Sequence, residues 1–325
     1  MTAFRVGIDS YSLRPLALPP QQVLRWAHEH GTDGVHFTEL HLPDPAAVDD
    51  EFLDALAGEA RDLGLYLEWG GAQHIPFDLT TWTPKEIGAI NARAARQARR
   101  LGTRVIRSCS GGLMRWTDEA PETEAILEAM ARALREQRAR LEDLDVVLAI
   151  ELHFEFTTFE LQRLFEMCDA PPGGYLGICL DPMNLLTMIE DPVAATERIL
   201  PWIVAVHAKD GALGLSPRGL TSFPTPMGDG QIDFERILSL LSSLDRAVHL
   251  SVEAHGGSFE IPIFDPAFLR RFPDLTAAEL SRLIEMAVRK PDALSPLARE
   301  DWPARCERRV IEDVRRLKRL VASGR

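Results

Sequence analysis

Eight short apolar runs recur along the chain, and they constrain its fold more than any other feature. Most of them are rich in Val, Ile and Leu, and each is followed by polar or Gly-rich residues and then by a helical pattern. Their first residues lie 27 to 45 positions apart, which leaves room for a helix and two loops. The runs cover residues 4–9, 33–38, 64–69, 103–108, 146–151, 176–181, 203–208 and 248–253. Such runs are typical of strands that are buried on both faces of a parallel sheet.

The segments between the runs have helical periodicity. In residues 122–144, five large apolar side chains fall on one helical face: Ile126, Leu127, Met130, Leu134 and Leu141. Gly31, Gly64 and Gly102 each stand shortly before a strand-like run, where a glycine that ends a helix is expected. Strands that alternate with helices predict βαβ units, and eight such units predict an α/β fold, the closed (β/α)8 TIM barrel. The alternative is an open doubly wound sheet, but no GxGxxG motif follows the first run.

The pattern loosens after the eighth run. We expect a long loop carrying aromatic residues over 257–275, a helix over 276–290, an irregular Pro-rich segment over 291–303 and a last helix over 304–322. The chain is therefore predicted to form one domain over 1–325, with its barrel core at about 4–256. Residues 257–325 would then be a C-terminal helical extension that acts as a lid or as a contact in a homo-oligomer, either a dimer or a tetramer.

Charge and composition exclude several classes of partner. The net charge of −13 argues against a nucleic-acid partner, because binding a phosphate backbone needs a basic surface. No run of eighteen apolar residues is present, so we expect no membrane span, and the N-terminus lacks the apolar segment of a signal peptide. The cysteines have no CxxC spacing, which favours reduced thiols and a cytoplasmic location. They are Cys109, Cys168, Cys179 and Cys306.

Ionisable residues end four consecutive runs. Barrel active sites lie at the C-terminal ends of the strands, and here these positions carry Glu151, Asp181, His207 and Glu253. Three carboxylates in one place would repel and raise one another's pKa values, whereas a divalent cation would remove that cost. An oxygen-rich set with one imidazole suits Mn²⁺ best, with Mg²⁺, Co²⁺ or Zn²⁺ as alternatives. The competing interpretation is a metal-free network of ion pairs.

Five motifs at these strand ends resemble those of a known group, the xylose isomerase-like barrel superfamily of sugar isomerases and epimerases. The resemblance covers about residues 4–256 and includes IELH (150–153), LDPMN (180–184), VHAKD (206–210), GDGQIDF (228–234) and VEAHG (252–256). It implies a TIM barrel in which the matching Glu, Asp, His and Glu bind one divalent metal ion. It also implies that the two glutamates move protons, which here gives catalytic roles to Glu151 and Glu253.

The chemistry of such a site gives three candidate functions. A metal that grips a carbonyl oxygen and the neighbouring hydroxyl would stabilise an enediolate, so proton transfer by Glu151 and Glu253 would make an isomerase or epimerase of a keto-sugar or keto-polyol. If the substrate has a β-leaving group, the same site would make a lyase or dehydratase, like the keto-inositol dehydratases or the enzymes that cleave 3-keto-glycosides. The third candidate is a non-catalytic binding barrel.

Asn184 separates the chain from two groups of the superfamily. The apurinic endonucleases with three zinc ions need a histidine three residues after the strand-six aspartate, and another near residues 108–111, where this chain has Ser-Cys-Ser-Gly. We therefore reject the nuclease interpretation. Ketose 3-epimerases also commonly carry that histidine, so Asn184 leaves the lyase and hydrolase groups open beside them.

Several further residues are candidates for substrate binding. His153 follows Glu151 by two positions and could contact substrate hydroxyls, orient Glu151, or be a packed loop histidine. Lys209 could bind a phosphate, a carboxylate or an alkoxide, or form an ion pair with Asp210 or another neighbour. The other candidates are Asn184, Glu68 and His74, and Trp69, His36 and Glu39 could also line a sugar pocket. The motif GDGQIDF is expected to make a turn and to start a helix with Asp233 as its N-cap.

Overall fold

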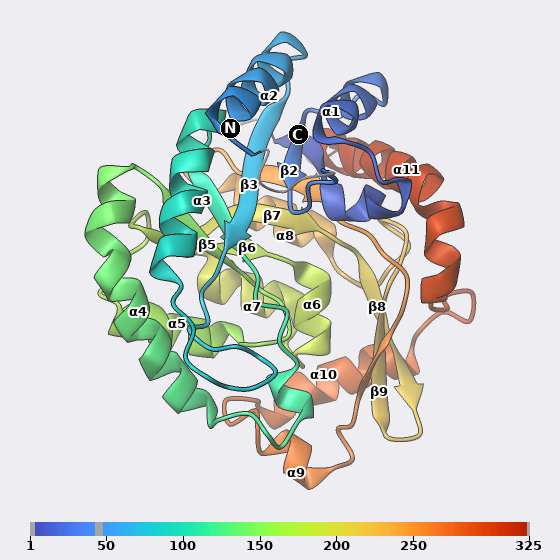
Figure 1. Ribbon diagram of the computed structural model, residues 1–325. Coiled ribbons are helices and arrows are strands. Elements are labelled where there is room, and N and C mark those ends of the chain that lie inside the picture. The colour runs from blue at the N-terminus through green and yellow to red at the C-terminus, as the bar shows by residue number, and fades with distance from the viewer. Residues whose placement is uncertain (1–3, 43–47, 324–325) are drawn as a thin grey trace.

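A closed barrel of eight parallel strands forms the centre of the molecule, and helices surround it (Figure 1). The computed structural model describes residues 4–42 and 48–323. Around the barrel the strand order is β1-β10-β7-β6-β5-β4-β3-β2, and all eight contacts between neighbours are parallel. The strands are β1 (Arg5–Asp9), β2 (Gly34–Phe37), β3 (Tyr66–Ala72), β4 (Val105–Ser108), β5 (Val147–Glu151), β6 (Leu176–Leu180), β7 (Ile203–Ala208) and β10 (His249–Val252). Each lies within or overlaps one of the eight apolar runs, so the predicted TIM barrel is confirmed.

The helices between the strands also follow the predicted alternation. They are α1 (Pro20–Glu29), α2 (Asp50–Asp62), α3 (Gly88–Leu101), α4 (Thr123–Asp143), α5 (Thr158–Met167), α6 (Pro182–Thr187), α7 (Pro192–Ile199) and α8 (Phe234–Ser242). Gly102 ends α3 with a φ of 81°, a left-handed conformation that suits glycine, and its N–H donates to the Ala98 carbonyl. Asp233 caps α8 by accepting a hydrogen bond from the Arg236 N–H at 2.9 Å, as predicted.

A small antiparallel sheet, which the sequence interpretation missed, stands beside the barrel mouth. Strands β8 (Gly211–Ser216) and β9 (Gly219–Pro224) form a hairpin between β7 and α8, and β11 (Phe259–Ile261) pairs with β9. The expected loop over 257–275 therefore contains this strand and a short helix, α9 (Pro266–Leu269). The hairpin turns at Pro217 and Arg218, and Gly219 follows with a φ of 147°. A Cβ at Gly219 would lie 2.5 Å from the Ile261 carbonyl oxygen, so only glycine allows the third strand to approach.

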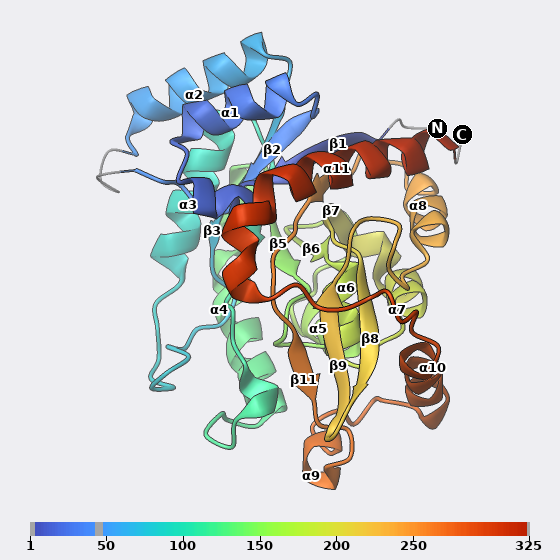
Figure 2. The same ribbon diagram turned by 90° about the vertical axis from the view of Figure 1, so that its right-hand side faces the viewer.

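The C-terminal helices occupy the expected part of the chain. They are α10 (Ala277–Val288) and α11 (Trp302–Ser323), with the short 3-10 turn η5 (Arg299–Asp301) directly before α11. Helix α11 packs on β1, β10 and α8, and Figure 2 shows it running alongside β1 and α1. Its Glu307 accepts a hydrogen bond of 2.9 Å from the Trp26 indole of α1. Helix α11 thus closes the ring of helices in the place of the eighth barrel helix.

The structure agrees with the prediction that the thiols are unpaired. All four cysteines are free, and Cys168, Cys179 and Cys306 are buried. In the described ranges, no helix has both the length and the apolar character that crossing a membrane requires.

The packing of α11 predicts that it unfolds together with the barrel. Leu317 is completely buried, so the Leu317→Ala substitution is expected to lower the free energy of unfolding by about 2–5 kcal/mol. Arg315 lies two residues away on the exposed side of α11, and Arg315→Ala should change the free energy of unfolding by no more than about 0.5 kcal/mol. Urea denaturation followed by circular dichroism measures both values. If α11 melted in a separate early step and left the main transition unchanged, the helix would be an accessory to the barrel.

Candidate functional site

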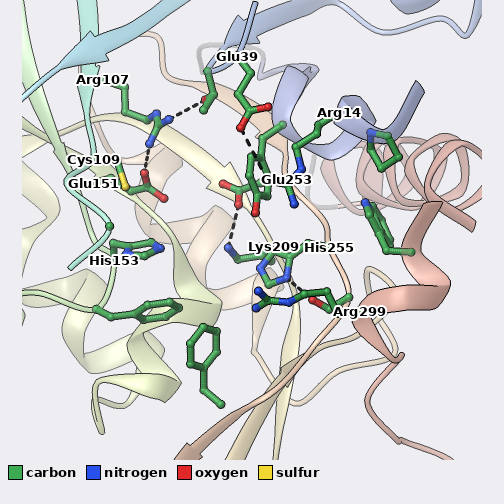
Figure 3. A pocket seen from close by; sticks show the side chains of 18 of the residues that line it. Arg14, Glu39, Arg107, Cys109, Glu151, His153, Lys209, Glu253, His255 and Arg299 are labelled. Atoms are coloured by element: carbon green, nitrogen blue, oxygen red, sulfur yellow. Dashed lines mark hydrogen bonds and ion pairs between the residues drawn. The ribbon is translucent and has the colours of Figure 1, made fainter. Parts of the chain in front are cut away.

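A cavity of about 690 Å³ opens at the carboxyl ends of the barrel strands, and Figure 3 shows the side chains around it. Ionisable groups line it from several strands and from the C-terminal segment. They include Glu151, His153, Lys209, Glu253 and Arg299. Aromatic and apolar side chains, among them Phe154, Phe259 and Trp302, line the rest. A cavity with apolar walls and a few converging polar groups is the usual form of a small-molecule site.

The four residues predicted to bind metal lie together at this end of the barrel. Glu151, Asp181, His207 and Glu253 each offer one ligand atom, and these atoms all lie within 4.8 Å of one another. All four side chains are buried. We call this set the four-residue cluster. The closure of the barrel brings β5, β6, β7 and β10 side by side, and the cluster follows from that topology.

The contacts of Asp181 fix both of its oxygens. It is the N-cap of α6, and its Oδ1 accepts hydrogen bonds from the N–H groups of Met183 and Asn184 at 3.1 and 3.2 Å. The Asn184 side-chain amide donates to Oδ2 at 3.0 Å and to the Leu152 carbonyl at 3.0 Å. Asn184 is buried and is not among the residues that line the cavity. In this structure Asn184 therefore positions Asp181.

His207 faces the carboxylates with one nitrogen and the barrel interior with the other. Its Nδ1 lies 2.5 Å from Glu253 Oε2 and 3.3 Å from Glu151 Oε1. Its Nε2 lies 3.2 Å from Oδ2 of Asp9, the residue that ends β1. A carboxylate behind a histidine fixes the ring orientation and is common behind metal-binding histidines.

Arg107 and Lys209 place positive charge against the cluster. Arg107, on β4, forms an ion pair with Glu151 and donates a hydrogen bond to Thr38 at 2.8 Å. Burial by itself would raise the pKa of Glu151, but Arg107 and His207 outweigh it, and the pKa is lowered. Lys209 Nζ lies 2.6 Å from Asp181 Oδ2 and 3.2 Å from Glu253 Oε1. Lys209 thus contacts the cluster, and its expected alternative partner Asp210 instead accepts N–H bonds from Gly211, Gly228 and Gly230.

The charge balance of the cluster is incomplete at Asp181. Burial raises the pKa of Asp181 to about 6, and the neighbouring carboxylates of Glu253 and Glu151 add to this rise against the opposing effect of Lys209. The pKa of Glu253 is lowered, because Lys209 and His207 overcome the effect of its burial. An additional cation at the cluster would favour the ionised form of Asp181.

The donor set fits a divalent metal ion. His207 Nδ1 is buried and has no hydrogen-bond partner, although two carboxylates lie close to it. A metal ion would satisfy this nitrogen and would neutralise the three carboxylates at the same time. The residues that would hold the ion are the four that the sequence predicted.

The other predicted substrate-binding residues divide into two groups. His153 and Lys209 line the cavity, whereas Glu68 and His74 are buried and are not among its lining residues. The Glu68 carboxylate lies inside the barrel, 3.0 Å from Nδ1 of His249 and 3.3 Å from Nδ1 of His36. Burial by itself would raise the pKa of Glu68, but the two histidines outweigh it and lower the pKa to about 2. The structure therefore does not bring Glu68 or His74 to the cavity surface.

Several residues of the site were missed in the sequence. Asp9 ends the first apolar run as Asp181 ends the sixth, so the same signal was available for it. Arg107 directly follows the apolar pair Val105 and Ile106 in the run 103–108, and a charge at a strand position buried on both faces is a signal for a buried partner. Arg14 and Arg299 line the cavity from two short 3-10 helices, η1 (Ser10–Leu16) and η5, and no periodic pattern in the sequence indicates them.

Comparison with known proteins gives two partial sequence relatives. The chain is 28% identical to the uncharacterized protein YihM of Escherichia coli (strain K12) over 149 residues, which are 46% of this chain and 44% of YihM. It is 26% identical to the 3-oxo-isoapionate decarboxylase of Pectobacterium atrosepticum over 203 residues, which are 62% of this chain and 66% of that enzyme. The chain thus matches less than two thirds of the length of either relative.

The fold and the family are matched over more of the chain. An L-ribulose 3-epimerase structure aligns with a TM-score of 0.63 at 19% sequence identity, covering 99% of this chain and 95% of the epimerase, which shows a shared fold. The family described as xylose isomerase-like TIM barrel matches residues 24–286. The closed barrel and this match over most of the chain show that the protein belongs to the xylose isomerase-like TIM barrel family.

Proposed function

We propose that the protein is a divalent-metal-dependent isomerase or epimerase that acts on a keto-sugar or keto-polyol. The observation that carries this proposal is the four-residue cluster of Glu151, Asp181, His207 and Glu253, of which Glu151 and Glu253 line the cavity. The likeness of the fold to an L-ribulose 3-epimerase supports it. Mn²⁺ is the proposed ion, with Mg²⁺, Co²⁺ and Zn²⁺ as alternatives, since three of the four ligands are oxygens.

Glu151 and Glu253 are proposed to carry the protons. Glu151, Asp181, His207 and Glu253 would hold the ion, which when bound would act as a Lewis acid and make the hydroxyl-bearing carbon next to a substrate carbonyl more acidic. Both glutamates have lowered pKa values, so both are ionised near neutral pH and either can accept a proton. They come from β5 and from the end of β10, on different sides of His207 in the barrel. One would remove a proton from one face of the substrate and later release it to water, and the other, once protonated from water, would deliver a proton to the opposite face.

Cationic groups at the cavity support a second candidate, a metal-dependent lyase. Arg14 and Arg299 both line the cavity, and Figure 3 shows both side chains directed toward it. Arg14 Nη1 lies 3.9 Å from Glu39 Oε1, and the Arg299 side chain makes no hydrogen bond or ion pair with the described residues. These arginines suit a substrate with a carboxylate, and one partial relative is a 3-oxo-isoapionate decarboxylase. Loss of carbon dioxide from a keto acid would also need a cation that withdraws electrons from the substrate carbonyl, and the four-residue cluster would hold that cation.

Metal analysis tests the four-residue cluster directly. The Asp181→Ala, His207→Ala double variant removes two ligands, and the protein is expected to lose the ion bound there after dialysis against trace Mn²⁺. A matched His28→Ala, Asp62→Ala variant changes one exposed histidine and one exposed aspartate, and it should bind as much Mn²⁺ as the wild-type protein. Elemental analysis of both proteins, with circular dichroism to verify folding, decides the assignment. Full Mn²⁺ content in the first variant would refute it.

Hydrogen exchange tests the roles of the glutamates. Metal-loaded protein incubated in D₂O with a panel of keto-sugars should incorporate deuterium beside the carbonyl of its substrate. Glu151→Gln and Glu253→Gln are each expected to slow this exchange by about 10²–10⁴-fold, because each removes a proton-transfer group. Glu128→Gln, on the exposed side of α4, should leave the rate unchanged. Mass spectrometry measures the exchange, and wild-type rates in both cluster variants would contradict these roles.

The mass of the product separates the two candidate functions. An isomerase or epimerase gives a product with the mass of the substrate, whereas a lyase gives a product lighter by water or by carbon dioxide. If the substrate is a keto acid, Arg299→Gln is expected to raise KM by roughly 10- to 100-fold, because a charge-assisted hydrogen bond contributes about 1.5–3 kcal/mol. For a neutral sugar the same variant should bind almost as well as wild type. If a keto acid gives a product of lower mass and the Arg299→Gln variant has the wild-type KM, Arg299 does not bind the substrate carboxylate.

A further inference from the structure

A second group of metal-ligand side chains lies in the wall of the same cavity. Cys109 follows β4, and His153 and Glu155 follow β5. Each offers one ligand atom, and the three atoms lie within 4.8 Å of one another. None of these residues belongs to the four-residue cluster. Cys109 and His153 line the cavity, as Figure 3 shows, and Glu155 is buried behind it with 1% exposure.

Polar atoms in this group are buried without partners. Glu155 Oε1 accepts a hydrogen bond of 2.9 Å from the Gly112 N–H, but its Oε2 has none, and neither does His153 Nδ1. His74 is completely buried, and its Nδ1 contacts Ser108 Oγ at 2.8 Å while its Nε2 has no partner. Glu155 is the charged group that acts most strongly on His74. Buried polar atoms normally have hydrogen-bond partners, so the unpaired atoms of Glu155 and His153, with that of the neighbouring His74, point to a missing partner.

The spacing of these atoms suits coordination better than a hydrogen bond. His153 Nδ1 lies 3.5 Å from Glu155 Oε2, and the contact does not satisfy hydrogen-bond geometry. Two ligands that bind one tetrahedral ion with bonds of about 2.0–2.1 Å are about 3.3–3.4 Å apart. The observed separation is therefore close to the edge of a coordination tetrahedron. The Cys109 sulfur lies within 4.8 Å of one ring nitrogen of His153 and one carboxylate oxygen of Glu155, so it is available as a third ligand.

The ligand types differ from those of the four-residue cluster. A thiolate, an imidazole and a carboxylate carry two negative charges, which balance one divalent ion. The sulfur makes this set softer than three carboxylates and one imidazole, and therefore better suited to Zn²⁺ than to Mn²⁺. Burial and the nearby Glu151 raise the pKa of the Cys109 thiol, so metal binding would release the thiol proton to water.

We propose that Cys109, His153 and Glu155 form a second divalent-metal site that prefers Zn²⁺. Three protein ligands leave a fourth position of the tetrahedron for water or a substrate oxygen, and the cavity-lining positions of Cys109 and His153 give access to it. The site is independent of the isomerase proposal, because it rests on other residues and is measured without turnover. Its position after β4 and β5 places a second cation in the wall of the substrate cavity.

Cobalt substitution tests the second site, since a thiolate bound to Co²⁺ gives a charge-transfer band in the near ultraviolet. Metal-free full-length protein loaded with Co²⁺ is expected to show this band and to bind about two ions per chain. Cys109→Ser should abolish the band and leave about one ion. Cys306→Ala removes another buried thiol, in α11, and should keep both the band and the two ions. The Asp181→Ala, His207→Ala variant should keep the band and lose the other ion.

Thiol protection gives a second readout in case Cys109→Ser does not fold. In the Asp181→Ala, His207→Ala background, Zn²⁺ should slow alkylation of Cys109 by iodoacetamide at least tenfold, as mapped by peptide mass spectrometry. Adding Glu155→Gln, which keeps the side-chain shape, should abolish that protection. Wild-type protein that binds one Co²⁺ without a charge-transfer band, or Cys109 alkylation that Zn²⁺ does not slow, overturns the proposal. Either result would leave His153 and Glu155 as an ion pair and would not affect the four-residue cluster.

Discussion

Mutual repulsion among the buried carboxylates of Glu151, Asp181 and Glu253 is the constraint on which the rest of the site depends. Closure of the barrel forces these three groups to within 4.8 Å of one another and of His207. Arg107 and Lys209 offset part of the charge from two sides, and His207 reaches two of the carboxylates. These contacts hold Glu151 and Glu253 ionised, whereas the pKa of Asp181 remains raised at about 6. Asp181, the carboxylate that Asn184 orients, is therefore the cluster carboxylate whose charge is least balanced, and an added cation would favour its ionised form.

The fold and the four-residue cluster could be predicted because both depend on short-range sequence patterns repeated along the chain. Each strand is recognisable by itself, and parallel closure then brings the strand ends together without further information. The cations could not be assigned in the same way. Arg107 pairs with a residue 44 positions away, and only the register of β4 against β5 brings the two together. The β8–β9 hairpin was missed because Gly211–Pro224 has few large apolar side chains, and its third strand, β11, joins from 35 residues beyond Pro224.

Asn184 illustrates how one position can have a structural role that a motif comparison does not reveal. The resemblance noted in the sequence implies a histidine at this position, so an amide there suggests a change in the substrate site. In the structure its amide spans Asp181 and the Leu152 carbonyl, so it connects the end of β6 to the segment that follows β5. Its Oδ1 is buried without a partner. Asn184 therefore acts on the orientation of a cluster carboxylate.

The chemistry and the shape of the cavity come from different parts of the chain. The cluster residues stand on barrel strands, where a displacement of one side chain disturbs its neighbours in a closed ring. Arg299, Trp302 and Phe259 line the same cavity from the segments after β10, outside the sheet that positions the cluster. The packing of α11 on the barrel places Trp302 at the cavity, and the pairing of β11 with β9 places Phe259 there, so neither depends on the register of the barrel strands. A change of substrate in such a protein can therefore arise in residues 257–303 while the cluster stays intact, which is consistent with one fold serving several reactions on related sugars.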